Sequence, residues 1–314
     1  MLTINITMSK HQPTGAFPKF SLAPIHEYTD SPFRLLCQRH GAKAVFVPLV
    51  NVTSVVKGKI LPDIDENERG VHVQLSGSKP GEFTEALKII ERNFPNIEGF
   101  NVNAGCPSHT TMKTGAGSAL MKVPETLSEI IKQCKSATSV PVSVKSRIFT
   151  DEAKTINFYK GIENAGADFV IIHGRTVKQG YSGRANWDTV SSIKANLSMP
   201  TIGNGDMQTL TEAESSVSRK LCDGVMFGRA ALQNPMLFEK KNILSDKERK
   251  ELVFEYYEIC KKLGVTDLKD VKLVSTQLLK GVKNASRMRN AIMKSKRVID
   301  LMALIDNWLE NPKE

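Results

Sequence analysis

One cysteine stands in a segment where it could do chemistry. Cys106 lies in the stretch GFNVNAGCPSHTTMKTGAGSAL, residues 99–120, between a glycine and a proline. A cysteine there can be an acid, a nucleophile, a metal ligand or simply a small buried residue. The five cysteines are scattered and no two have a CxxC spacing, so we expect neither a zinc site nor a disulfide framework.

Other polar side chains lie at the ends of apolar, β-branched segments. Gln74 lies in VHVQLSG, Lys145 and Arg147 in VPVSVKSR, and His173 and Arg175 in ADFVIIHGRT. A lysine at a strand end can bind an electron-rich ring edge, and a histidine can donate a hydrogen bond or act as a base. Taken alone, Lys145 is better explained as a solvated strand-end side chain and His173 as a half-buried histidine.

Two glycine-containing segments are typical of phosphate binding. IGNGD contains Gly203 and Gly205, and MFGRAAL contains Gly228 and Arg229. The glycines allow backbone amides to approach an anion closely, and the arginine can add a bidentate contact. Ordinary turns remain the alternative for either segment alone.

The elements that carry these residues recur with a regular alternation. Eight apolar segments read as parallel strands buried on both faces, with helical patterns between them. They are residues 20–25, 44–49, 71–77, 97–105, 140–147, 167–175, 200–206 and 223–229. Eight such units predict a (β/α)₈ barrel, in which the polar strand ends converge on one mouth. An open doubly wound sheet is the alternative, and residues 50–70 are expected to form an extended loop.

The pattern changes near residue 245, where helices follow one another without strands. We therefore predict a barrel domain over residues 1–242 and a small all-helical domain over residues 243–314. Residues 271–297 contain eight basic and no acidic side chains: Lys272, Lys280, Lys283, Arg287, Arg289, Lys294, Lys296 and Arg297. If this stretch is one helix, five of them fall within an arc of about 100°. Such a stripe, with a net charge of +10 for the chain, favours a polyanionic partner over a merely solvated face.

The chain has no apolar run near the ~20 residues of a membrane span. Residues 1–17 lack the apolar core of a signal peptide. We expect a cytoplasmic monomer.

Taken together, the motifs resemble those of the tRNA-dihydrouridine synthase family over about residues 20–305. The resemblance is carried by APIHEYTDSPFR, the glutamine of VQLSG, NAGCP, GAGSAL, VKSR, HGRT followed by GYSG, GNGD, FGRAAL and the basic tail LLKGVKNASRMRNAIMKSK. It implies an FMN-containing (β/α)₈ barrel followed by a helical RNA-binding domain. The implied reaction is reduction of the uracil 5,6 double bond in tRNA, with NADPH as the reductant.

The resemblance also implies roles for individual residues. Cys106 corresponds to the proton donor, which must begin as a protonated thiol. The implied FMN-binding residues are Ala23, Pro24, Ile25, Gln74, Lys145, His173, Asn204, Gly205, Asp206, Gly228 and Arg229. The expected substrate-binding residues are Asn103, Lys145, Arg147, Arg175, Lys280, Lys283, Arg287, Lys294 and Arg297.

The chain departs from the family pattern at four places. Ile25 stands where methionine is usual, Asn101 where aspartate is frequent, and Val274 where histidine is frequent. After Cys-Pro the segment reads SHTT, and His109 is the one candidate for the basic residues common there. These departures bear on the tRNA position and on fine substrate contacts. Two other functions are compatible with the residues: an FMN barrel acting on a free pyrimidine or a dihydroorotate-like molecule, and a tRNA-binding protein without catalysis.

Overall fold

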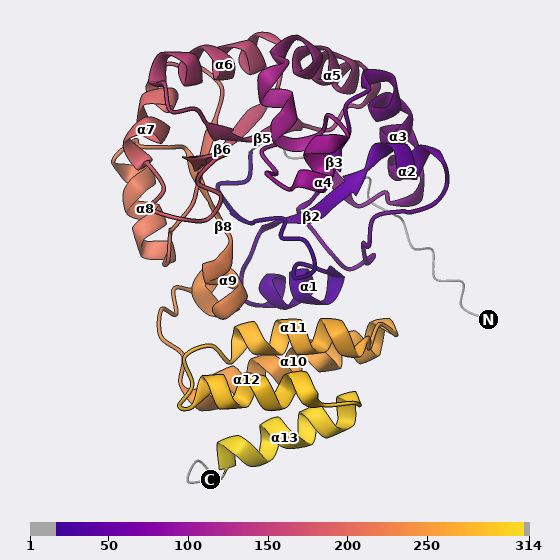
Figure 1. Ribbon diagram of the computed structural model, residues 1–314, viewed down its shortest axis with the longest axis vertical. Coiled ribbons are helices and arrows are strands. Elements are labelled where there is room, and N and C mark those ends of the chain that lie inside the picture. The colour runs from indigo at the N-terminus through magenta and orange to yellow at the C-terminus, as the bar shows by residue number, and fades with distance from the viewer. Residues whose placement is uncertain (1–16, 311–314) are drawn as a thin grey trace, which may run out of the picture.

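A closed barrel of eight parallel strands forms the body of the protein (Figure 1). The computed structural model describes residues 17–310. The N-terminal segment examined above for a signal peptide, residues 1–17, therefore lies almost entirely outside the described residues. The strands are β1 (Phe20–Leu22), β2 (Ala44–Asn51), β3 (Val71–Ser76), β4 (Ile97–Ala104), β5 (Val142–Ile148), β6 (Phe169–Thr176), β7 (Thr201–Asn204) and β8 (Gly224–Phe227). They pair in chain order, and β1 closes on β8. The predicted (β/α)₈ barrel is confirmed, and the open sheet is excluded.

Helices surround the barrel and return the chain between strands. The α-helices are α1 (Ser31–Arg39), α2 (Val52–Val56), α3 (Pro80–Asn93), α4 (His109–Lys113), α5 (Pro124–Ala137), α6 (Glu152–Asn164), α7 (Trp187–Ala195), α8 (Leu210–Ser218) and α9 (Arg229–Gln233). Two 3₁₀ helices, η1 (Gly117–Lys122) and η2 (Pro235–Glu239), join them. Residues 50–70 were expected to be an extended loop, but they contain α2. Its start is set by the Asn51 side chain, which accepts a hydrogen bond from the Ser54 amide.

Part of the barrel interior is filled by large apolar side chains. Phe46, Phe169 and Ile202 belong to a buried cluster inside the strands, and His72 stacks on Phe46 with ring centroids 4.7 Å apart. Burial lowers the pKa of His72 to about 4, so this ring is neutral. Gly99 is required beside it, because a Cβ there would lie 2.3 Å from the His72 ring. This packed layer leaves the carboxyl ends of the strands for chemistry.

A buried ion pair fixes the long connection that precedes β3. The guanidinium of Arg34 lies 2.7 Å from a Glu68 carboxylate oxygen, and neither side chain is exposed to solvent. Arg34 also donates to the backbone oxygen of Thr29 at 2.7 Å, and the Thr29 hydroxyl accepts from the Ile25 amide at 2.9 Å. The pair therefore supports the turn that follows β1.

Four helices pack beneath the barrel in Figure 1. They are α10 (Asp246–Leu263), α11 (Leu268–Leu278), α12 (Ala285–Lys294) and α13 (Val298–Glu310). Tyr256 on α10 donates from its hydroxyl to the carboxylate of Asp30 at 2.7 Å, and its ring meets Phe33 edge-on. Arg249 donates to the backbone oxygens of Gln233 and Leu278 at 3.1 and 2.9 Å. These contacts hold the helical part against α1 and α9.

The idea that residues 271–297 form one helix is wrong. The stretch contains the second part of α11, which ends at Leu278, and then all of α12. It stops just before α13 begins. The break lies at residues 279–284, where Gly281 and Asn284 have φ angles of 102° and 58°. The arc calculated for a single helix therefore does not describe the basic surface. None of the helices between residues 17 and 310 is long and apolar enough to cross a membrane.

Candidate active site

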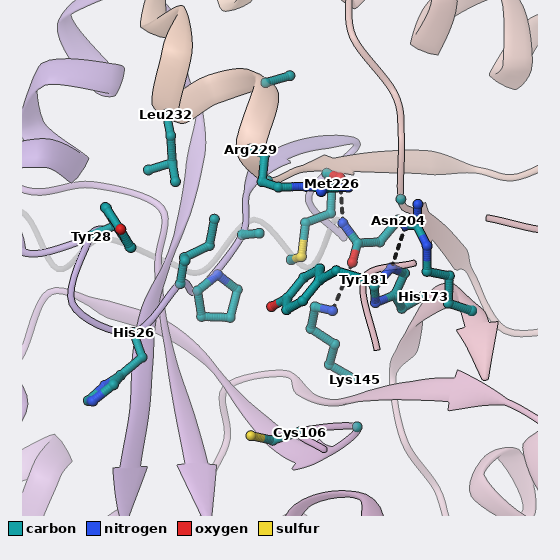
Figure 2. A pocket seen from close by; sticks show the side chains of 18 of the residues that line it. His26, Tyr28, Cys106, Lys145, His173, Tyr181, Asn204, Met226, Arg229 and Leu232 are labelled. Atoms are coloured by element: carbon teal, nitrogen blue, oxygen red, sulfur yellow. Dashed lines mark hydrogen bonds between the residues drawn. The ribbon is translucent and has the colours of Figure 1, made fainter. Parts of the chain in front are cut away.

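A deep pocket opens at the carboxyl ends of the strands (Figure 2). Its volume is about 830 Å³. The site residues expected from the sequence that line it are Ala23, Pro24, Ile25, Gln74, Asn103, Cys106, Lys145, Arg147, His173, Arg175, Asn204, Gly205, Asp206, Gly228, Arg229 and Lys280. Strands far apart in the sequence thus bring these groups to one mouth. Lys283, Arg287, Lys294 and Arg297 do not line the pocket.

Lys145 lies on β5 in the wall of the pocket and is hydrogen-bonded to a side chain on β7, two strands away. Its Nζ donates to Oδ1 of Asn204 at 2.9 Å, and Nδ2 of Asn204 donates to the Met226 backbone oxygen at 2.8 Å. Burial, with a smaller contribution from the positive charge of Arg147, lowers the pKa of Lys145 to about 7. The pocket therefore contains a desolvated ammonium whose ionisation would be favoured by an electron-rich ligand.

His173 on β6 stands beside this lysine in Figure 2. Burial and the nearby charges of Lys145 and Arg147 lower its pKa to about 2, so the imidazole is neutral. Its Nε2 lies 3.2 Å from Nη1 of Arg175. Because a guanidinium can only donate, Nε2 accepts and Nδ1 carries the proton. His173 is thus a hydrogen-bond donor toward a ligand rather than an acid.

The two arginines expected to bind substrate are largely engaged by the protein. Arg175 donates to both carboxylate oxygens of Asp206 at 2.6 Å and to the Gly183 backbone oxygen at 2.8 Å. Arg147 donates to the backbone oxygens of Gly105 and Gly180 at 2.9 and 2.8 Å. Both side chains line the pocket, and their bonds brace the loops after β4, β6 and β7.

A network of amides joins the pocket wall to the cysteine. Nδ2 of Asn103 donates to Gln74 at 2.8 Å, and its Oδ1 accepts from the Cys106 amide at 2.9 Å. Gln74 donates in turn to Asn101 at 2.7 Å, and Asn101 donates to the Ser143 hydroxyl at 2.9 Å. An aspartate at position 101 could accept the hydrogen bond from Gln74, but it could not donate one to the Ser143 hydroxyl. The Asn101 departure thus has a structural role here.

Cys106 is the partly exposed member of the five cysteines, which all lie within the described residues; the other four are buried. Residues 117–120 of the GAGSAL segment lie in η1, and the Ser118 amide donates to the Cys106 backbone oxygen at 3.0 Å. Gly117, with a φ of 62°, is needed there, since a Cβ would lie 2.8 Å from that oxygen. This close packing holds the Cys106 backbone beside the pocket.

Sequence reasoning missed several side chains that line the pocket. Tyr181 is 64% exposed at its mouth, between the guanidinium groups of Arg147 and Arg229, which lie 5.9 and 5.4 Å from its ring centre. Tyr181 belongs to the GYSG motif, and this motif was the sequence signal that could have identified it as a pocket residue. Gln277 reaches the pocket from α11. No local sequence pattern predicts this position, because it depends on how the helical part packs against the barrel.

The fold and the site together define a (β/α)₈-barrel enzyme with its active site at the carboxyl ends of the strands. Residues 21–307 match the model of the dihydrouridine synthase family. The chain is 31% identical over 302 residues to a probable tRNA-dihydrouridine synthase of Aquifex aeolicus, covering 92% of this chain and 95% of that protein. It is 32% identical over 231 residues to tRNA-dihydrouridine synthase B of Vibrio vulnificus, covering 71% and 70%. The chain belongs to the dihydrouridine synthase family and is an oxidoreductase.

Solved structures show the same fold at low sequence identity. An old yellow enzyme homologue from Zymomonas mobilis superposes with a TM-score of 0.52 at 14% identity, covering 74% of this chain and 92% of that chain. Histamine dehydrogenase from Rhizobium sp. 4-9 gives a TM-score of 0.52 at 13% identity, covering 77% and 49%. At these identities the likeness concerns the barrel alone.

Proposed function

We propose that this protein reduces the 5,6 double bond of specific uridines in tRNA, using FMN and NADPH, with Cys106 as the proton donor. The observation that carries the proposal is the meeting of Cys106 with Lys145 and His173 in one pocket, within a chain of this family. A non-catalytic tRNA-binding protein would need none of these three groups. We place the activity in the cytoplasm, where the tRNA substrate is found.

The pocket residues fit a flavin mononucleotide. The buried ammonium of Lys145 suits the electron-rich pyrimidine edge of an isoalloxazine, and Gln74 adds an amide beside it. Arg229, 54% exposed and paired with Asp206 at 3.2 Å, shares its positive charge with that carboxylate and can extend it to a phosphate. Gly228 leaves its surroundings open, because an added Cβ would meet only Ile25, at 3.8 Å. We assign the ring edge to Gln74, Lys145 and His173, the ring face to residues 23–25, and the phosphate end to residues 204–206, 228 and 229.

Reduced FMN, when bound, supplies the hydride that uracil C6 receives. The residues of the chain then complete the addition. The Cys106 thiol gives its proton to C5 as negative charge develops on the uracil carbonyls, which leaves a thiolate on the protein. We assign the stabilisation of that charge, by a hydrogen bond, to His173 or Lys145. Asn103 positions the base, because it is tied to both Gln74 and the Cys106 amide.

Binding of tRNA must offset the cost of turning a base out of its stack, a few kcal/mol. Lys280 lines the pocket from the helical part and can contact the phosphates next to the flipped nucleotide. Lys283 and Arg287 lie farther out, in the loop before α12 and on α12 itself. Arg297 is ion-paired with Asp300 at 2.6 Å, so its contribution to RNA binding is smaller than the sequence indicates.

A substrate comparison tests this function against the small-molecule alternative. The purified enzyme, reconstituted with FMN and supplied with NADPH, is offered unmodified tRNA and free uridine in parallel, and dihydrouridine is measured by mass spectrometry. We expect product from tRNA and none above background from uridine. Equal turnover of the two substrates would contradict the proposal, and so would a protein that cannot be loaded with FMN.

A further inference from the structure

The segment SHTT, which follows Cys106-Pro107, places a hydroxyl next to the proposed acid. Oγ1 of Thr111 on α4 lies 3.8 Å from Sγ of Cys106, within hydrogen-bonding reach of a thiol. We propose that Thr111 is a positioning residue that holds the Cys106 side chain through this S–H···O bond and keeps the proton directed for transfer. The inference rests on the proposed function, in which Cys106 is the donor.

Packing fixes which side of the threonine faces the sulfur. A Cβ on Gly117 would lie 2.8 Å from the Thr111 methyl carbon and 3.2 Å from the Cys106 Cβ. Gly117 thus makes room for the methyl group, while the hydroxyl is on the side of Sγ. Since a β-branched side chain in a helix has few χ1 rotamers, this arrangement costs little additional entropy.

The backbone around Thr111 is also held. The Met112 amide donates to the Ser108 backbone oxygen at 2.9 Å, and the Thr114 hydroxyl donates to the Thr111 backbone oxygen at 2.8 Å. On the other side, the Cys106 amide and backbone oxygen are bonded to Asn103 and Ser118. Both partners of the S–H···O contact therefore lie on fixed backbone.

A hydroxyl suits both states of the acid. It can accept a hydrogen bond from the thiol before proton transfer and, after rotating, donate one to the thiolate that transfer leaves. A cationic side chain in the same place would favour the thiolate before the reaction and so remove the proton the reaction needs. His109 and Thr110, which precede Thr111 in α4, are exposed and make no such contact with the sulfur.

Infrared spectroscopy of the S–H stretch tests the hydrogen bond without relying on catalysis. The Cys106 band is identified in the holoenzyme by its absence from Cys106→Ala. We expect this band to move to higher frequency in Thr111→Val, which keeps the shape of the side chain and removes the hydroxyl. Thr111→Ser and the matched control Thr110→Val should leave it in place. A band that does not move in Thr111→Val overturns the proposal.

Single-turnover kinetics test the functional part. Reduced holoenzyme is mixed with unmodified tRNA, and dihydrouridine formation is followed. We expect Thr111→Val to lower the rate constant about tenfold with unchanged tRNA affinity, and Thr111→Ser to retain most of the rate. In the Cys106→Ala background, Thr111→Val should have no further effect, because it acts through the sulfur.

Other results separate the possible failures. Equal slowing by Thr111→Val in both backgrounds would show a merely structural role for Thr111 and overturn the proposal. Full activity of Cys106→Ala would instead remove the proposed donor. Thr111 would then have no proton donor to position, even if the infrared shift shows that its hydrogen bond to Cys106 exists.

Discussion

Nζ of Lys145 lies 2.9 Å from Oδ1 of Asn204, and this bond joins β5 to β7 across the wall of the active site. Asn204 is held in turn by the Met226 backbone oxygen on β8. The ammonium is thus fixed in place, but a single amide oxygen compensates poorly for its loss of water, as its lowered pKa shows. The buried ammonium is therefore unfavourable in the protein without a ligand, and an electron-rich ligand would stabilise it.

This unfavourable burial predicts a pH-dependent effect of Lys145→Met on the FMN-free protein. The pKa of Lys145 falls from 10.5 to about 7 on folding, so between these values the unfolded chain binds more protons than the folded chain. Wild-type stability should therefore rise with pH relative to the variant over that window. In urea titrations, Lys145→Met should be most stabilising below about pH 7, and the gain should shrink toward pH 10.5. A difference that does not change with pH would contradict the burial of this charge.

The Arg34–Glu68 pair predicts a large loss of stability for Glu68→Gln. The substitution keeps the shape of the side chain but leaves Arg34 buried without its counter-charge, which costs about 3–5 kcal/mol. Urea unfolding of the FMN-free protein measures the change. The exposed pair Lys79–Glu82 provides the control, and Lys79→Gln should cost at most about 1 kcal/mol. Similar losses for the two variants would show that Arg34 is solvated.

The basic surface of the helical part predicts a change in the salt dependence of tRNA binding. Arg287→Glu combined with Lys294→Glu should weaken binding and make the slope of log K against log salt shallower, by about 0.7–0.9 for each phosphate that the variant no longer neutralises. Lys88→Glu with Lys132→Glu, on the exposed faces of α3 and α5, is the matched double reversal and should change the slope little. An unchanged slope in the α12 variant would place the RNA elsewhere.

The barrel could be predicted from the sequence because its signals are local. Each strand is a continuous apolar segment, and a polar residue such as Gln74 or Lys145 interrupts it where the pocket begins. The convergence of these residues then follows from parallel pairing alone. The same reasoning identified Cys106, since no other cysteine stands at a strand end with glycines after it.

Tertiary pairing could not be predicted in the same way. From the sequence, we expected Arg175 to bind substrate. In the structure its guanidinium is ion-paired with Asp206, which lies more than thirty residues away in the sequence, in the loop after β7. The break between α11 and α12 had signals in Gly281 and Asn284, which the uniform run of basic residues obscured. The role of Thr111 depends on the contact of α4 with the cysteine loop, and a run of four polar residues does not reveal it.

In the proposed reaction, Cys106 protonates the uracil of a tRNA nucleotide. The most direct test of this step is the product yield of Cys106→Ala in a single turnover, with FMN content and tRNA affinity measured on the same preparation. We expect normal FMN content and tRNA binding, with dihydrouridine formation lowered by about 10²–10⁴, the usual contribution of a general acid. A variant that forms dihydrouridine at the wild-type rate would contradict the account.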